Sequence, residues 1–149
     1  MRNQLAVLIL IASVVLLVLL DRGTKVSDNS VKTEPAKVEP IQGTDFKQVT
    51  LTAKAAERLG IKTVPVREEI SARTDTLKLV VPYDSIIYGL NGETWVYINP
   101  KSLVFVRSPI SIDYIVGDFA ILSEGPTSGT KVVTVGVAQL YGIDTGIGK

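Results

Sequence analysis

The feature that most constrains this chain is an apolar run near its N-terminus. Residues 5–20 read LAVLILIASVVLLVLL and are interrupted only by Ser13. As a helix this run spans about 24 Å, slightly less than the ~30 Å hydrocarbon core of a bilayer. The flanking Arg22 side chain can cover the shortfall by snorkelling. We therefore predict a single N-terminal transmembrane helix at residues 1–20.

A cleavable signal peptide is the alternative for this segment. Such a peptide needs a shorter apolar stretch followed by small residues at the cleavage site. Here Leu20 leads directly into Asp21 and Arg22, so an uncleaved signal anchor is favoured. Because the chain has no cysteine, lipoprotein processing is excluded.

The orientation of this anchor does not follow from its flanking charges. The N-terminal side has only Arg2 and the α-amine, and the other flank carries Arg22, Lys25, Lys32 and Lys37. This count alone favours the reverse topology, but long segments cross a membrane largely regardless of charge. We expect the N-terminus in the cytoplasm and the remainder outside, on the basis of a resemblance given below.

Residues 21–45 differ sharply from the run before them. Five of these twenty-five residues are apolar, and charges alternate in sign through the sequence KTEPAKVEP. Pro35 and Pro40 disfavour a helix, and so polar a segment buries too little surface to offset its chain entropy. We expect a disordered tether at 21–45 and a folded β-domain at 46–149.

The composition of the whole chain excludes several kinds of chemistry. The chain has no cysteine and no histidine, and its one methionine is Met1. It cannot form a disulfide, a thiolate nucleophile, an imidazole base or a Cys/His metal site. We therefore expect no enzymatic activity, no cofactor and no metal. With 16 basic and 15 acidic residues, the net charge provides no bulk attraction to nucleic acid or anionic lipid, and no nucleic-acid partner is expected.

Short strands dominate the pattern of the folded domain, with turn residues about every eight to twelve positions. Within residues 85–98, the pair Asn91-Gly92 predicts a hairpin turn, because both residue types accept positive φ. Pro109 is expected to end one strand and to separate it from another that begins at Ile110. These signals predict a mainly β fold, a small antiparallel barrel or sandwich.

Short helices are expected at two places in this domain. A helix over 53–59 has Thr52 as its N-cap and Gly60 just beyond its end. A helical turn over 137–141 is expected to end at Gly142, with the remaining glycine-rich residues frayed. The expected domain thus contains one or two short helices among its strands.

Trp95 and Tyr97 are candidates for contact with a partner. They lie on one face of a predicted strand, and Val96 lies on the other. If the Val96 face is buried, Trp95 and Tyr97 form an exposed aromatic patch suited to a protein partner. If it is not, they belong to the core or to cross-strand pairs with residues such as Phe105. Together with Arg107, they are the candidate docking residues.

Carboxylates are the main remaining candidates for acid–base chemistry. Asp113 and Asp118 lie across a predicted turn, and Asp84 and Glu124 lie near strand ends. Each position is typical of a turn or edge residue, and no catalytic residue is predicted. A hydrolase would need Asp113 or Glu124 in a closed cleft with a raised pKa.

The order of several segments resembles a known family. VTLTAKAAERLGIKTVPV, residues 49–66, is similar to the stretch that opens many periplasmic adaptor subunits of resistance-nodulation-division efflux pumps, the HlyD-like membrane fusion proteins. The segments VPYDSIIYGLNGETWVYI, FVRSPISI and GPTSGTKVVTVGVAQLYG resemble the C-terminal membrane-proximal domain of those adaptors. The matched stretches cover most of residues 49–142, about two-thirds of the chain.

One departure from this family is large. Adaptors place a lipoyl-like domain and a long α-helical hairpin between these two blocks, whereas here Val81 leads directly into Pro82. The missing middle part is the one that reaches the outer-membrane channel in the family. The resemblance therefore implies the base of an adaptor, a β-domain held close to the cytoplasmic (inner) membrane on its periplasmic side. Metal-efflux adaptors add methionine or histidine ligands, which this chain lacks apart from Met1.

Together these observations predict a single-pass, membrane-anchored, non-enzymatic accessory protein that docks to an efflux or export transporter at the extracytoplasmic membrane face. The alternative is a structural or assembly component of a secretion system or another cell-envelope machine, because an anchor, a linker and a β-domain are also the plan of such scaffolds. The sequence leaves open whether the chain forms a homo-oligomer.

Overall fold

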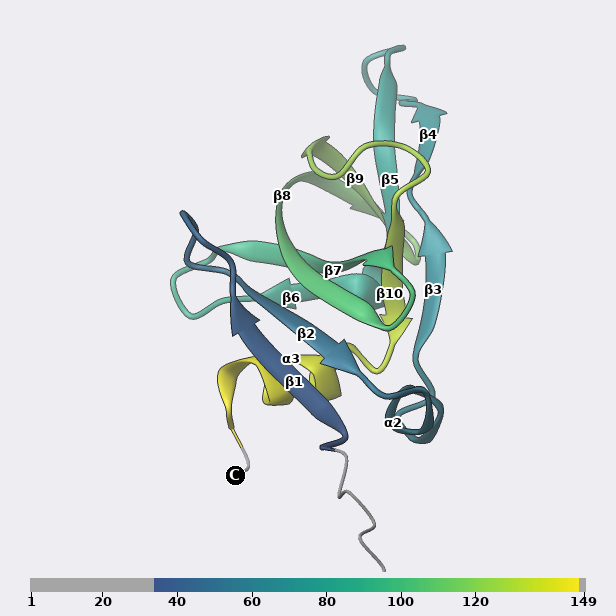
Figure 1. The fold of residues 1–149 in the computed structure, drawn as a ribbon. Coiled ribbons are helices and arrows are strands. Elements are labelled where there is room, and N and C mark those ends of the chain that lie inside the picture. Colours follow the sequence, from purple (N-terminus) through teal and green to yellow (C-terminus); the bar gives the residue numbers. More distant parts are fainter. Residues whose placement is uncertain (1–33, 148–149) are drawn as a thin grey trace, which may run out of the picture. The chain divides into compact units, whose positions relative to one another are not determined.

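The structure, a computed structural model, describes residues 34–147 (Figure 1). The predicted transmembrane helix at 1–20 and the first part of the predicted tether lie outside these residues. Within 34–147, no helix combines the length and the apolar character needed to cross a membrane. Most of this part of the chain forms β-strands joined by short helices and turns, so the predicted mainly β fold is confirmed.

The elements follow one another along the chain with short connections. They are β1 (Ala36–Pro40), β2 (Lys47–Leu51), α2 (Ala53–Arg58), β3 (Lys62–Pro65), β4 (Arg67–Ile70), β5 (Leu77–Pro82), the 3-10 turn η1 (Tyr83–Ser85), β6 (Ile86–Tyr88), β7 (Thr94–Lys101), β8 (Val104–Val116), β9 (Phe119–Glu124), β10 (Lys131–Val135) and α3 (Val137–Thr145). Every strand pairing within the described residues is antiparallel.

The strands form a nearly closed barrel, which is one of the two predicted architectures, a barrel or a sandwich. Hydrogen-bonded neighbours follow the order β3-β10-β7-β8-β9-β5-β4, and the two strands at the ends of this path, β3 and β4, are consecutive in the chain. Val66 joins them. Its N–H donates to the Thr130 carbonyl at 2.8 Å, and its carbonyl accepts from the Gly129 N–H at 2.9 Å. Outside this path, β6 pairs with β7, and β1 pairs with β2, which pairs with β8.

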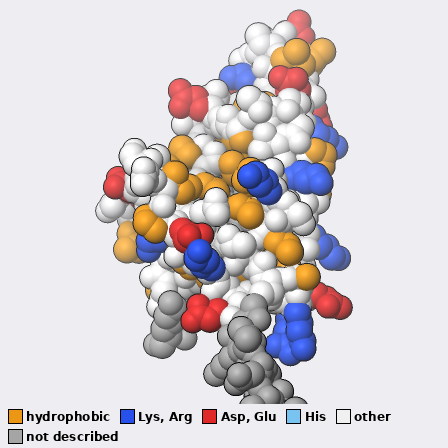
Figure 2. Space-filling view, viewed as in Figure 1, with side chains coloured by type: hydrophobic (Ala, Val, Ile, Leu, Met, Phe, Trp, Pro, Cys, Tyr) orange, Lys and Arg blue, Asp and Glu red, His pale blue; other side chains and the backbone are white. Residues whose placement is uncertain are grey.

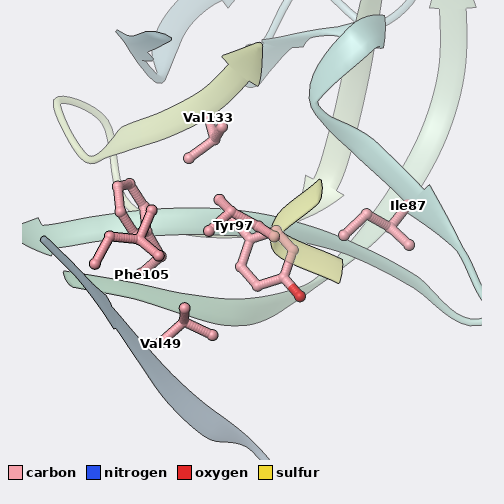
Figure 3. Close-up of a cluster of buried hydrophobic side chains, with 7 residues drawn as sticks. Val49, Ile87, Tyr97, Phe105 and Val133 are labelled. Carbon is pink, nitrogen blue, oxygen red and sulfur yellow. The ribbon is translucent and has the colours of Figure 1, made fainter. Parts of the chain in front are cut away.

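Two clusters of buried apolar side chains lie on the two faces of β7. Figure 3 shows the Tyr97 ring among Val49, Phe105 and Val133 in the first cluster. Val96, the preceding residue, belongs to the second cluster. Neither Val96 nor Tyr97 has exposed surface. Because successive side chains of a strand point to opposite faces, β7 is buried on both sides.

The strand β1 places the start of the folded domain earlier than predicted. It lies within the segment expected to be a disordered tether, and it pairs with β2 along its whole length. Ala36 and Val38 pack against the first core cluster, whereas Lys37 and Glu39 form an ion pair at 2.8 Å on the surface. The folded domain therefore begins by Ala36 rather than at residue 46. Pro40 obscured the strand pattern, but proline is tolerated in an edge strand such as this one.

The helix α2 forms where it was predicted. The Thr52 hydroxyl accepts a hydrogen bond from the Ala55 N–H at 3.2 Å, which is the expected N-cap contact. Gly60 follows the helix with a φ of +62°, a conformation that glycine adopts without strain. Ala56 and Leu59 pack against the first core cluster, so one side of this short helix is anchored to the barrel.

The helix α3 is longer than predicted. It was expected to end at Gly142, but it continues through that residue to Thr145 and is capped by Gly146, which has a φ of +75°. Leu140 and Asp144, four residues apart and hence on one helix face, are both buried. Packing of this face outweighs the roughly 1 kcal/mol that a glycine costs inside a helix. The expected frayed end is therefore ordered at least as far as Gly146.

The strand β8 runs through Pro109 instead of ending there. On one side, β8 pairs with β2 as far as Val106 and with β9 from Ser111 onward. Pro109 falls between these two partners on that side, while Trp95 lies opposite it on the other. A proline is compatible with a strand where one edge is unpaired, so the predicted break at Pro109 is wrong.

The predicted hairpin around Asn91-Gly92 is present as β6 and β7. Its loop is longer than the two residues typical of that dipeptide. The Gly89 N–H donates to the Glu93 carbonyl at 2.7 Å, and the Gly92 N–H donates to the Gly89 carbonyl at 3.3 Å. Of the central pair, only Gly92 has a positive φ, +88°. This is a β-turn followed by a left-handed glycine, another common hairpin connection.

Candidate functional site

The strands β7 and β8 meet the helix α3 at a buried carboxylate. Asp144, near the end of α3, has a side chain with no exposed surface. Its Oδ2 lies 2.6 Å from Nε of Arg107 and accepts a hydrogen bond of 2.8 Å from the Tyr97 hydroxyl. Tyr97 and Arg107 are direct partners in the β7–β8 ladder, so their side chains emerge from one face of the sheet. We refer to Tyr97, Arg107 and Asp144 as the Asp144 cluster.

Aromatic rings surround the cationic member of this cluster. The guanidinium carbon of Arg107 lies 5.4 Å from the ring centroid of Trp95 and 5.8 Å from that of Phe46. These distances allow cation–π attraction to both rings. The Arg107 side chain keeps 15% of its surface exposed, so the ion pair is open to solvent only on the arginine side.

The polar contacts of the cluster are unequal in quality. The Arg107 Nε–Asp144 Oδ2 contact is close but poorly aligned for a hydrogen bond, and Asp144 Oδ1 has no hydrogen-bond partner among residues 34–147. The Tyr97 hydroxyl therefore provides the well-aligned hydrogen bond to the carboxylate. In addition, Lys47 Nζ donates to the Asp144 backbone carbonyl at 3.2 Å. A lysine at this position complements the negative end of the α3 dipole.

Electrostatics keep the Tyr97 phenol protonated. Burial raises the pKa of Tyr97 far above its ordinary value of 10.0, and the hydrogen bond to Asp144 and the charge of that carboxylate raise it further. The nearby Arg107 charge acts in the opposite direction without cancelling these effects. A phenol that stays neutral donates a hydrogen bond but does not act as a base or nucleophile near neutral pH. The arrangement is suited to fastening α3 to the barrel.

The three predicted docking residues are brought together, but not as an exposed patch. Of the two alternatives left open for Trp95 and Tyr97, the exposed aromatic patch does not form at Tyr97, because Val96 and Tyr97 are both fully buried. The alternative, that Tyr97 belongs to the core with Phe105, is confirmed. Trp95 is partly buried and packs against the same cluster. The Arg107 side chain pairs with Asp144 and is only partly exposed to solvent.

Asp144 was missed because its segment was predicted to fray. Two signals in the sequence could have found it. Asp144 follows Leu140 by four residues, which places it on the apolar face of a helix if that helix continues through Gly142. Arg107 follows Phe105 by two residues, which places a cation on the inward face of a strand. A buried cation requires an opposite charge nearby, and the acid on α3 provides it.

The candidate acid–base residues are on the surface. Asp113 forms an ion pair of 3.2 Å with Lys78 and retains 37% of its side-chain surface, and Glu124 is exposed at the end of β9. Asp84 and Asp118 are exposed as well. Among the residues that the structure describes, no group of three or more Asp, Glu, His or Cys side chains is arranged to hold a metal ion.

An open cavity of about 560 Å³ lies beside the β6–β7 loop. Its lining includes Tyr88, Glu93 and Ile115. The Glu93 carboxylate is held by Asn91, whose backbone N–H donates to Oε2 at 3.1 Å and whose Nδ2 donates to Oε1 at 3.2 Å. Hydrogen bonding to the Glu93 backbone, and then to Asn91, lowers the pKa of Glu93 below its ordinary 4.5. Glu93 is thus a fixed surface anion and not a proton donor.

Comparison with known proteins leaves the chain without an assigned family. No protein-family model matches it, and no curated protein matches it either. The resemblance to HlyD-like adaptors therefore depends on the sequence segments quoted above.

Large apolar side chains are exposed at the tip of one hairpin. Ile70 and Leu77 are direct partners at the outer end of the β4–β5 ladder. Their exposed fractions are 69% and 65%. Figure 1 shows β4 and β5 extending beyond the other strands at this end of the molecule. Ile70 and Leu77 are thus two neighbouring exposed apolar side chains on a projecting hairpin.

Proposed function

We propose that this chain is a single-pass, membrane-anchored, non-enzymatic accessory protein whose barrel docks to an efflux or export transporter at the extracytoplasmic face of the inner membrane. The apolar run at residues 5–20 supports the anchor, and the order of segments shared with adaptors supports the class of partner. The single observation that carries docking is the exposed pair Ile70 and Leu77.

This pair is presented on an ordered hairpin. The Ser71 Oγ lies 2.7 Å from the Tyr114 hydroxyl, within hydrogen-bond distance. The guanidinium carbon of Arg73 lies 3.9 Å from the centroid of the same tyrosine ring. These contacts hold the tip of the hairpin against β8. Because the tip is already ordered, little conformational entropy is lost when a partner covers Ile70 and Leu77.

The length of the connecting chain also supports docking close to the membrane. Fifteen residues, 21–35, separate the predicted transmembrane helix from β1. Such a segment spans at most about 50 Å when fully extended. A barrel held within that distance experiences a high effective concentration of any transporter beside the anchor, so a weak contact is sufficient.

Co-purification of the full chain from membranes in a mild detergent tests this proposal. We expect a transporter to be recovered with the wild-type chain. The double variant Ile70→Thr/Leu77→Thr should recover about tenfold less, which corresponds to a loss of roughly 1.4 kcal/mol of binding free energy. Threonine retains the β-propensity of the replaced residues, so the hairpin should persist.

Glu68→Gln is the matched control, because it changes an exposed residue of the same strand without touching the apolar pair. Recovery should be unchanged in this variant. A clean monomer with no partner under mild crosslinking would contradict the proposed function, and equal recovery with the double variant would contradict the role of the hairpin.

A further inference from the structure

We infer that the barrel also binds the anionic surface of the membrane, through a strip of exposed basic side chains beside the point where the chain enters the barrel. The basic strip consists of Lys54 and Arg58 on α2, Lys62 on β3 and Lys131 on β10. This inference depends on the proposed function only in that the predicted anchor holds the barrel near lipid.

The position of the strip follows from how the chain enters the fold. The Thr52 N–H donates to the Pro35 carbonyl at 3.0 Å, and Thr52 is the N-cap of α2. The residue that precedes β1 therefore lies next to the start of α2. A chain arriving from the predicted anchor therefore enters the barrel beside α2, and the surface around this helix lies next to the point of entry.

The four basic residues lie on three neighbouring elements, since α2 leads directly into β3 and β3 pairs with β10. Lys54 and Arg58 are four residues apart on α2, which places them on one side of the helix. Lys62 begins the next strand, β3, and Lys131 is the ladder partner of Pro65 at the other end of that strand. All four basic residues are exposed. Figure 2 shows basic side chains along the side of the molecule formed by β3 and α2.

The charge of the strip is largely uncompensated. The ion pairs found among residues 34–147 involve Lys37, Arg67, Lys78 and Arg107, and none involves a member of the strip. Glu57 is the one acidic residue within α2. The part of the chain that the structure describes holds 11 basic and 13 acidic residues, so the strip is a basic region on a slightly acidic domain. The balanced charge of the whole chain conceals this segregation.

An anionic membrane is the occupant that fits these observations. Each lysine or arginine close to an anionic bilayer strengthens attachment about fivefold. The attraction extends over roughly 10 Å at 0.1 M salt, a range that matters only for a domain already held near the surface. The expected result is a preferred orientation, with α2 toward the lipid and the β6–β7 loop away from it.

The full chain, reconstituted in vesicles, provides the test. Because the chain has no cysteine, Ala53→Cys can carry a single fluorescent donor on α2, and vesicles can carry an acceptor on their headgroups. Leu90→Cys is the matched control. Leu90 lies in the loop before β7, whereas the turn after β7 contacts the segment leading to α2, through the Leu51 N–H and the Leu103 carbonyl at 2.9 Å. Vesicles of phosphatidylcholine alone are compared with vesicles containing phosphatidylglycerol.

We expect energy transfer from position 53 to exceed that from position 90 in the anionic vesicles. This difference should shrink as salt is raised from about 0.05 M to 0.5 M, because the Debye length shortens. Lys54→Gln/Arg58→Gln should reduce the difference to the value found in phosphatidylcholine. The control Arg67→Gln/Arg73→Gln, which removes two charges from the β4–β5 hairpin, should leave it unchanged.

The outcomes separate this inference from the proposed function. If the chain floats with phosphatidylcholine vesicles, the anchor is supported. If energy transfer from positions 53 and 90 is then equal in both kinds of vesicle, the role of the basic strip is overturned and the anchor is left intact. Flotation with anionic vesicles alone would overturn the anchor and support the strip, and flotation with neither would overturn both. A donor at position 53 that responds equally to a short DNA duplex would show a general polyanion site and would overturn the assignment to membrane.

Discussion

Asp144 and Arg107 form an ion pair in which Oδ2 and Nε are 2.6 Å apart. The two residues belong to different elements, α3 and β8. The carboxylate has no exposed surface, and the arginine keeps little. Because a buried charge without its partner is strongly unfavourable, this pair ties the position of the last helix to the barrel wall.

Removing the buried carboxylate should destabilise the domain. Asp144→Asn leaves Arg107 without an opposite charge, and we expect a loss of about 3 kcal/mol in the free energy of unfolding. This loss can be measured by urea unfolding, with the fluorescence of Trp95 as the signal. The control Asp113→Asn removes the exposed ion pair with Lys78 and should cost about 0–1 kcal/mol.

A double variant distinguishes an ion pair from two independent residues. Arg107→Met/Asp144→Leu replaces both charges with apolar side chains, and it should lose less stability than Asp144→Asn alone, because no buried charge remains unpaired. Losses that simply add for the two positions would show that Arg107 and Asp144 are not energetically coupled.

Tyr97 should make the stability of the domain sensitive to high pH. Its pKa is raised in the folded state above the ordinary 10.0. As the pH rises beyond 10, Tyr97 ionises in the unfolded chain but stays protonated in the folded chain, so the free energy of unfolding falls. Tyr97→Phe should cost about 1.5–3 kcal/mol at pH 7, and its stability should decline less steeply above pH 10. The free energies of unfolding of the wild-type chain and of Tyr97→Phe can be measured with urea between pH 9 and 11. If the two decline in parallel, the pH sensitivity does not come from Tyr97.

Glu93 should titrate below its ordinary pKa of 4.5, because hydrogen bonds to its own backbone and to Asn91 favour its charged form. Its contribution to stability is therefore present above pH 4.5 and is lost as the pH falls through the lowered pKa. Asn91→Ala should move the carboxyl pKa back toward 4.5, as measured by NMR titration. Leu90→Ala, next to Asn91 but without a contact to the carboxylate, should leave the titration unchanged.

Gly136 should be sensitive to substitution for two reasons. It has a φ of +88°, and a Cβ there would collide with Cδ1 of Ile61. Gly129 has a similar φ of +85° but open space around it. Gly129→Ala should cost about 1–2 kcal/mol for the left-handed conformation alone, and Gly136→Ala should cost more. Ile61→Val removes the colliding methyl. Added to Gly136→Ala, it should reduce the difference in stability between Gly136→Ala and Gly129→Ala, as measured by thermal unfolding.

The parts of this fold that were predictable are those with local causes. The helix α2 was predicted because its cap, Thr52, and its terminating Gly60 are adjacent to it in sequence. The β6–β7 hairpin was predicted because a left-handed glycine, Gly92, lies in its loop. In both places the structure depends on conformational preferences of a few neighbouring residues.

The parts that were not predictable depend on contacts between distant residues. Alternation along β7 indicates two faces, but it does not reveal that a second core covers Val96 while the first covers Tyr97. Gly142 suggests the end of a helix, and only the packing of Leu140 and Asp144 against the barrel overrides it. The strand β1 looks like a charged linker until β2 supplies its hydrogen-bond partners. At each of these places, tertiary contacts override the local conformational preference of the sequence.

The location of Asp144 has a consequence for folding of the chain. Lys47, which contacts the backbone of Asp144, precedes it by 97 residues. A chain in which the strands have paired but α3 has not yet packed holds a barrel in which Arg107 and Tyr97 have no carboxylate to bind. The domain should therefore remain open to chaperones and proteases until α3 packs, and then become protected in one late step.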